Sequence, residues 1–178
     1  YTTAAVLAGR REIHEGLVSG RGGIQVAPGA WASSEAVECR PAAQRRLLDQ
    51  LAALGDHVEY VLLDVGCEVG EHTQIYWQAA GQVLLVTTAD SVAVMDAYAA
   101  IKVAGSRNGS PIDLIINNLE PDQLPAEIHH RIDMSCQRFL GFGVGLAGHV
   151  PVDEQVAAAT RNRQLVCLSA PNSAAAQG

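Results

Sequence analysis

Lysine is almost absent from this chain of 178 residues, because Lys102 is the only lysine among its twelve basic residues. Basic residues are also outnumbered by 19 acidic ones, which gives a formal net charge of −7. An acidic chain offers no general electrostatic attraction for nucleic acid or for an anionic membrane surface. The composition therefore gives no strong nucleic-acid signal, and membrane association cannot be read from it.

Paired cysteines and long apolar runs are missing as well. Cys39, Cys67, Cys136 and Cys167 stand singly, without a CxxC pair, so neither a zinc site nor a disulfide framework is indicated. Reduced thiols favour a cytoplasmic location. No stretch approaches the ~20 apolar residues that a membrane-spanning helix needs.

Apolar residues make up 48% of the chain and charged residues 17%, which is enough to bury a sizeable core. Apolar runs of strand length alternate with stretches of helical spacing. The predicted strands cover residues 23–27, 58–65, 82–88, 112–118 and 143–150, and the predicted helices cover residues 41–54, 71–80, 91–103 and 153–160, with one more within 125–139. This alternation predicts an α/β fold, a mainly parallel sheet flanked by helices, in a single domain over residues 1–178. The run 58–65 is so continuously apolar that we expect it to be buried on both faces.

Asp64 ends the run Tyr60-Val-Leu-Leu-Asp64. Four apolar residues followed by Asp are typical of a Walker B strand, which delivers a carboxylate to the sheet edge to hold Mg²⁺ through water. The alternative is a carboxylate that only caps the next helix. The residues alone leave both interpretations open.

Two further predicted strands end in polar or rigid residues. Asn117 and Asn118 end the strand 112–118, and the strand 143–150 is followed by Pro151, Val152 and Asp153. An amide can read donor and acceptor positions of a purine, and a rigid segment can line a base pocket. These are also ordinary turn residues, and Asp153 fits a helix N-cap.

The helix 91–103 carries both charged and apolar residues. We expect Asp96 and Lys102 on its outer side and Val92, Met95 and Ala99 packed inward, from their spacing of three and four residues. The outer side is then a candidate surface for a partner, with an ordinary solvated face as the alternative.

Taken in order, these segments resemble the MinD/ParA superfamily, and most closely its flagellar-number branch, FlhG. The resemblance is carried by Tyr60–Asp64, by the segment from Val83 to Lys102, by Leu114–Asn118, by Leu146–Val156 and by Ala170-Pro-Asn-Ser173. The second of these is the most specific, since it is similar to the flagellar pattern VTTPEPTSITDAYALIK. The resemblance covers nearly the whole chain.

The resemblance implies a role for each candidate residue. Asp64 becomes the Walker B carboxylate, and Asn117 with Pro151, Val152 and Asp153 become contacts to adenine. It also implies ATP or ADP with Mg²⁺, an ATP-dependent homodimer, and protein partners in the flagellar or polar machinery. It also implies that the protein is cytoplasmic, with a state bound peripherally at the inner membrane.

One family motif is not found in this sequence. The family's phosphate-binding loop, of the KGGVGKT kind, cradles phosphates with backbone N–H groups and lysines, whereas Arg21-Gly22-Gly23 lacks the GK[ST] ending. The chain also begins at Tyr1 rather than Met. We therefore expect a P-loop NTPase (MinD-like) fold without its first strand, P-loop and first helix, and no ATP hydrolysis by this chain alone. The alternative is a non-hydrolysing scaffold of the CpaE/TadZ type that positions pili or secretion machinery.

Overall fold

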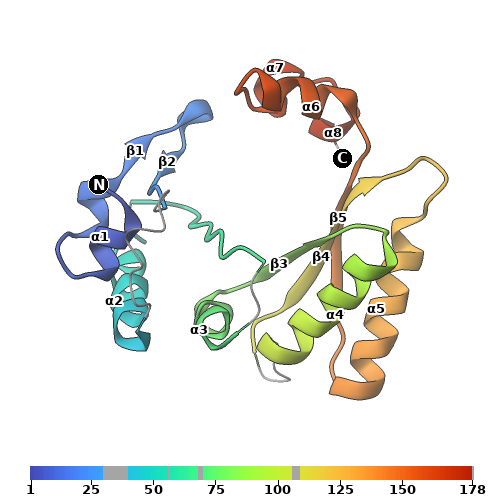
Figure 1. Ribbon diagram of the computed structural model, residues 1–178, viewed down its shortest axis with the longest axis horizontal. Coiled ribbons are helices and arrows are strands. Elements are labelled where there is room, and N and C mark those ends of the chain that lie inside the picture. Colours follow the sequence, from blue (N-terminus) through green and yellow to red (C-terminus); the bar gives the residue numbers. More distant parts are fainter. Residues whose placement is uncertain (30–39, 56, 68–69, 106–108, 178) are drawn as a thin grey trace. The chain divides into compact units, whose positions relative to one another are not determined.

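The computed structural model describes residues 1–29, 40–55, 57–67, 70–105 and 109–177, with residues 71 and 72 through their backbone alone (Figure 1). The chain separates into two compact units, Tyr1–Ala79 and Ala80–Gly178. The single domain predicted from the sequence stays a prediction.

Most of the regular elements of the first unit are helices and turns. Its elements are α1 (Thr3–Leu7), β1 (Val18–Ser19), β2 (Gln25–Val26), α2 (Pro41–Ala52) and α3 (Glu71–Ala79), with short 3₁₀ turns at Ile13–Gly16 and Arg21–Gly23. The strands β1 and β2 form an antiparallel pair. The predicted strand 23–27 is therefore reduced to two exposed residues that lie outside any parallel sheet.

A small core holds the first unit together. Val6, Ile13 and Leu47 are buried against one another, and the Ile13 backbone N–H donates to Gln50 Oε1 at 2.7 Å. The helix α2 begins at Pro41, whose fixed φ suits a first helical turn and whose missing N–H costs no hydrogen bond there. The predicted helices 41–54 and 71–80 are both confirmed, each to within two residues.

The predicted buried strand 58–65 is wrong for the described structure. Residues 57–67 contain no strand, and the apolar side chains at the centre of the run, Tyr60 to Leu63, are exposed, with Leu62 at 86%. A strand is stable only when neighbouring strands satisfy its backbone N–H and C=O groups. No described strand pairs with this run, so its sequence preference for a strand is not realised.

The second unit contains the parallel sheet. Its elements are β3 (Val83–Thr87), α4 (Ser91–Ala104), β4 (Ile112–Leu119), α5 (Pro125–Leu140), β5 (Gly145–Pro151), α6 (Glu154–Arg161), α7 (Val166–Ser169) and α8 (Ala174–Gln177). The three strands lie in the order β3-β4-β5, and both pairings are parallel. This confirms the predicted α/β fold with a parallel sheet flanked by helices (Figure 1).

One face of this sheet builds the core of the second unit. Ile112, Leu114 and Ile116 alternate along β4 on the buried face, and the helices α4 and α5 pack together and contribute Ile101 and Ile132. On β3, Leu84 and Val86 stay exposed, Val86 at 58%. The strand β3 is therefore buried on one face only.

The helix α4 buries the face opposite to the predicted one. Its buried residues are Val94, Ala97, Ala100, Ile101 and Ala104, whereas Val92 and Met95 are about two-thirds exposed, at 66% and 65%. Both sets recur at helical spacing, so spacing alone could not choose between two apolar faces. Asp96 and Lys102 are exposed as predicted.

Candidate functional site

The carboxyl end of β4 is irregular where Asn117 and Asn118 lie. In the parallel ladder Ile116 is opposite His149 and Leu119 is opposite Pro151, so three steps on β4 match two on β5. The extra residue makes a bulge, and Asn118 adopts a left-handed conformation with φ of 55°. Bulges re-aim side chains at strand ends. Asn117 is exposed at this point.

The end of β5 lies beside this bulge. Pro151 is the last residue of β5, and the Val152 backbone N–H donates to Leu119 O at 3.0 Å. The structure thus brings Asn117 and the Pro151–Val152 segment to the same edge of the sheet, as expected for the carboxyl ends of adjacent parallel strands. We call this region, made of Asn117, Asn118, Pro151, Val152 and Asp153, the strand-end edge.

Asp153 has a structural task at this edge. Its Oδ1 atom accepts a hydrogen bond from the Gln155 backbone N–H at 2.8 Å and so caps α6, and its Oδ2 atom accepts from the Ala175 N–H at 3.0 Å. The hydrogen bonds from Ala175 and Gln155 lower the pKa of this carboxyl group below its ordinary value. The N-cap interpretation of Asp153 is confirmed, and its predicted contact to a base stays a prediction.

Asp64 lies in the first unit, at the end of the irregular run. It is exposed, and its Oδ1 atom accepts a hydrogen bond from the Gly66 N–H at 3.1 Å. Gly66 has φ of 72°, which a glycine adopts without strain. This local turn is the turn chemistry that any Asp can make. The described residues contain no group of three or more His, Cys, Asp or Glu side chains placed to hold a metal ion.

The carboxyl end of β3 carries two polar residues that were not among the predicted site residues. The Thr87 hydroxyl group donates to Ala93 O at 3.1 Å, and the Asp90 carboxylate accepts from the N–H groups of Val92 and Ala93. Asp90 is the N-cap of α4, and Thr87, the last residue of β3, bonds to the first turn of that helix. The Asp-Ser pair before an apolar run is an N-cap signal that sequence reasoning could have used.

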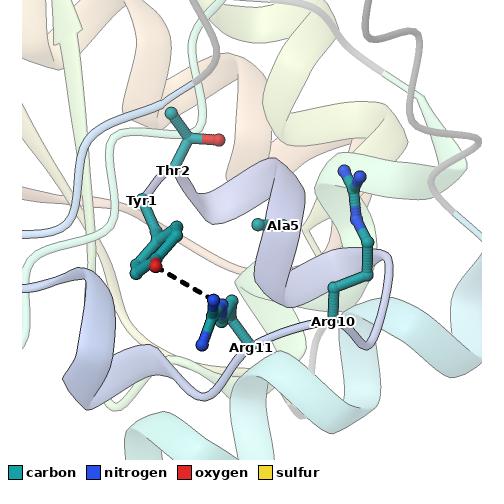
Figure 2. Close-up of a pocket in the computed structure, with 5 residues that line it drawn as sticks. All are labelled: Tyr1, Thr2, Ala5, Arg10 and Arg11. Atoms are coloured by element: carbon teal, nitrogen blue, oxygen red, sulfur yellow. Dashed lines mark hydrogen bonds between the residues drawn. The ribbon is translucent and has the colours of Figure 1, made fainter.

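A shallow pocket in the first unit is lined by Tyr1, Thr2, Ala5, Arg10 and Arg11. Figure 2 shows Arg11 directed toward Tyr1, to whose hydroxyl group it donates at 2.9 Å, and Arg10 directed away from it. Arg11 also lies over the Tyr1 ring and pairs with Glu15 at 3.2 Å. Arg11 is therefore occupied by local contacts, and the five lining residues include none of the predicted site residues.

The two ends of an adenine nucleotide, the base and the phosphates, need different protein groups. The exposed amide of Asn117 offers one acceptor and two donors beside a rigid proline, which suits a base. The phosphates need several N–H donors or lysines, and Lys102, the single lysine, lies in the last turn of α4. Asn117 and Pro151 thus carry groups of the kind that suits a base, whereas the sequence offers no lysine besides Lys102 for the phosphates.

No described helix is both long and apolar enough to cross a membrane. No family model matches the chain.

Among known proteins, the chain is 26% identical over 175 residues to the antiactivator FleN of Pseudomonas aeruginosa, covering 98% of the chain and 62% of FleN. It is 28% identical over 116 residues to the flagellum site-determining protein YlxH of Helicobacter pylori, covering 65% of the chain and 39% of YlxH. Its fold is similar to that of the cell division ATPase MinD of Pyrococcus furiosus, with a TM-score of 0.78 at 19% identity over 99% of the chain and 71% of that protein. The chain thus spans less than two thirds of the length of the curated relatives it matches.

Proposed function

We propose that the native protein is an ATP-dependent switch. The premise is the resemblance to the MinD/ParA superfamily on the flagellar side, which its relatives and its fold confirm. The switch would set the number or placement of flagella, or mark a cell pole or division site. FleN and YlxH are the relatives that favour the flagellar task. The activity of the chain, its nucleotide and its partners belong to this proposal.

The observation that carries the proposal is the strand-end edge. Asn117 and Pro151 come from different strands, and the hydrogen bond between Val152 N–H and Leu119 O holds those strand ends together. In open parallel sheets, ligands bind beyond the carboxyl ends of the strands. In our proposal the Asn117 amide reads the adenine edge, and the backbone at Pro151 and Val152 lines the base.

The proposal gives Asp64 the Walker B task that the family resemblance implies. Its carboxylate would hold Mg²⁺ through water, and a bound Mg²⁺ supplies charge neutralisation to transferring phosphate groups. The chain itself carries no phosphate cradle in its sequence. Hydrolysis is therefore proposed only for a native protein that supplies one.

The proposal includes a location and partners. The native protein would be cytoplasmic with a peripheral state at the inner membrane, and it would form a homodimer when ATP is bound. The dimer would bind proteins of the flagellar or polar machinery. Nucleotide state would decide whether these contacts form.

The base site is tested by titrating fluorescent adenine and guanine nucleotides into the full-length gene product and its Asn117→Ala variant. We expect tighter binding of the adenine nucleotide, and a loss of about 1–3 kcal/mol in the variant, the typical cost of an unpaired polar contact. That loss is several-fold to about a hundredfold in Kd. Equal affinity for both nucleotides, unchanged by Asn117→Ala, would show that the asparagine only turns the chain.

The non-hydrolysing scaffold stays the alternative to this proposal. Phosphate release by the full-length gene product separates the two. Turnover that Asp64→Ala abolishes supports the ATPase switch. Release at background, by a protein that still binds its partners, supports the scaffold.

A further inference from the structure

The Asp153 side chain bonds the C-terminal segment to the strand-end edge. The Asp153 carboxylate divides its two oxygen atoms between two elements: Oδ1 caps α6 through Gln155, and Oδ2 accepts the N–H of Ala175, 22 residues further along the chain. A carboxylate shared in this way acts as a joint between β5, α6 and α8.

The fastened segment, Ala170–Gln177, has its own ordered backbone. The Ser173 N–H donates to Ala170 O at 3.0 Å, and the Ala176 N–H donates to Ser173 O at 3.1 Å, which forms a turn followed by α8. α8 packs against β5 and α7. Because α8 has only four residues, its own hydrogen bonds cannot hold it as a helix. Its position must come from contacts such as the one to Asp153.

The joint lies next to the residues proposed to bind the base. Asp153 follows Val152, whose N–H is bonded to Leu119 O at the bulge that carries Asn117. We propose that Asp153 is a positioning residue, which holds the segment Ala170–Gln177 at the strand-end edge so that this segment forms one wall of the base site and contributes to base selection. This inference rests on the proposed function of that edge.

The substitution Asp153→Ser separates the two tasks of the side chain. Serine ranks with aspartate as an N-cap, so α6 keeps its cap. The single short hydroxyl group leaves Ala175 without its acceptor. Glu154→Gln is the matched control, because it removes one negative charge at the next, exposed position and touches neither hydrogen bond.

Two measurements on the full-length gene product test the inference. Amide hydrogen exchange at Ala175 should become about two- to tenfold faster in Asp153→Ser and stay unchanged in Glu154→Gln, since a net hydrogen bond shifts an equilibrium by about that factor. The ratio of Kd for guanine to Kd for adenine nucleotide should fall by a similar factor in Asp153→Ser alone.

The possible results distinguish a failure of this inference from a failure of the proposed function on which it rests. Faster exchange at Ala175 with an unchanged Kd ratio would contradict the claim that the segment Ala170–Gln177 forms part of the base site, and it would leave the base site itself in place. Unchanged exchange would overturn the joint itself. A wild-type protein that binds neither nucleotide would contradict the proposed function and, with it, the role of the segment Ala170–Gln177 in the base site. The exchange rate at Ala175 would still test whether Asp153 holds that segment.

Discussion

Single side chains at the strand ends determine which groups the edge of this sheet offers to a ligand. The family resemblance assigned Asn117, Pro151 and Asp153 to one base site, and the structure brings the ends of β4 and β5 that carry them to the same edge of the sheet. The bulge at Asn117 and Asn118 and the second contact of Asp153, to Ala175, were not predictable. Both depend on pairings between residues far apart in the sequence, which leave no local signal.

Gly145 is a residue whose lack of a side chain the sheet requires. A Cβ atom added there would lie 1.8 Å from Asp113 Oδ1 on the neighbouring strand, and that carboxylate already accepts a hydrogen bond from Gln82 Nε2 at 2.7 Å. Asp113 must move and lose this bond if Gly145 becomes alanine. We expect Gly145→Ala to lower the free energy of unfolding by about 1–3 kcal/mol, measured by urea denaturation.

Gly148 is the control in the same strand, because a Cβ atom there meets nothing within 4 Å. Gly148→Ala should change the free energy of unfolding much less. Equal losses in the two variants would mean that the close approach of Asp113 to Gly145 is not a feature of the folded protein.

Among the elements, the predicted helices were the more accurate and one predicted strand failed. Helices such as α2, α4 and α5 satisfy their own backbone hydrogen bonds, so caps and spacing nearly suffice to place them. The run 58–65 needs a neighbouring strand, and its sequence cannot state whether one is present. The buried face of α4 was missed for a different reason, since two apolar stripes satisfy the same period.

The two faces of α4 can be told apart by truncation. Ile101 is fully buried, at 0% exposure, and Met95 is exposed. Ile101→Ala should therefore lower the free energy of unfolding by about 2–5 kcal/mol, the usual cost of a cavity in a core, while Met95→Ala should change it by less than about 0.5 kcal/mol. A larger loss of unfolding free energy for Met95→Ala would mean that Met95 packs inward, as predicted from the sequence. Thermal or urea unfolding measures both.

The joint at Asp153 should make stability depend on acid pH. The hydrogen bonds from Ala175 and Gln155 lower the pKa of this carboxyl group in the folded chain below its ordinary value. The charged carboxylate therefore stabilises the fold at pH values above that ordinary value, and this contribution is lost as the pH falls through the lowered pKa. Unfolding of wild type and Asp153→Ala, followed at pH 7 and near pH 3, should show a difference in free energy that shrinks in acid. A difference that stays constant would contradict the charged contact.

For the whole molecule, the order of strands and helices was the strongest guide. The segments from Val83 to Ser173 carry the family resemblance, and the second unit shows the parallel sheet that this order predicts. Function follows less directly, because the base end and the phosphate end of a nucleotide need different residues. This chain supplies candidates for the first and one carboxylate, Asp64, for the second.

In the proposed function, nucleotide switches the native protein between a monomer and a dimer. Sedimentation of the full-length gene product without nucleotide, with ADP and Mg²⁺, and with ATP and Mg²⁺ tests this switch. We expect a monomer in the first two conditions and a dimer with ATP, and we expect Asn117→Ala to require more ATP for the same dimer fraction. A sedimentation coefficient that is the same in all three conditions would contradict the switch.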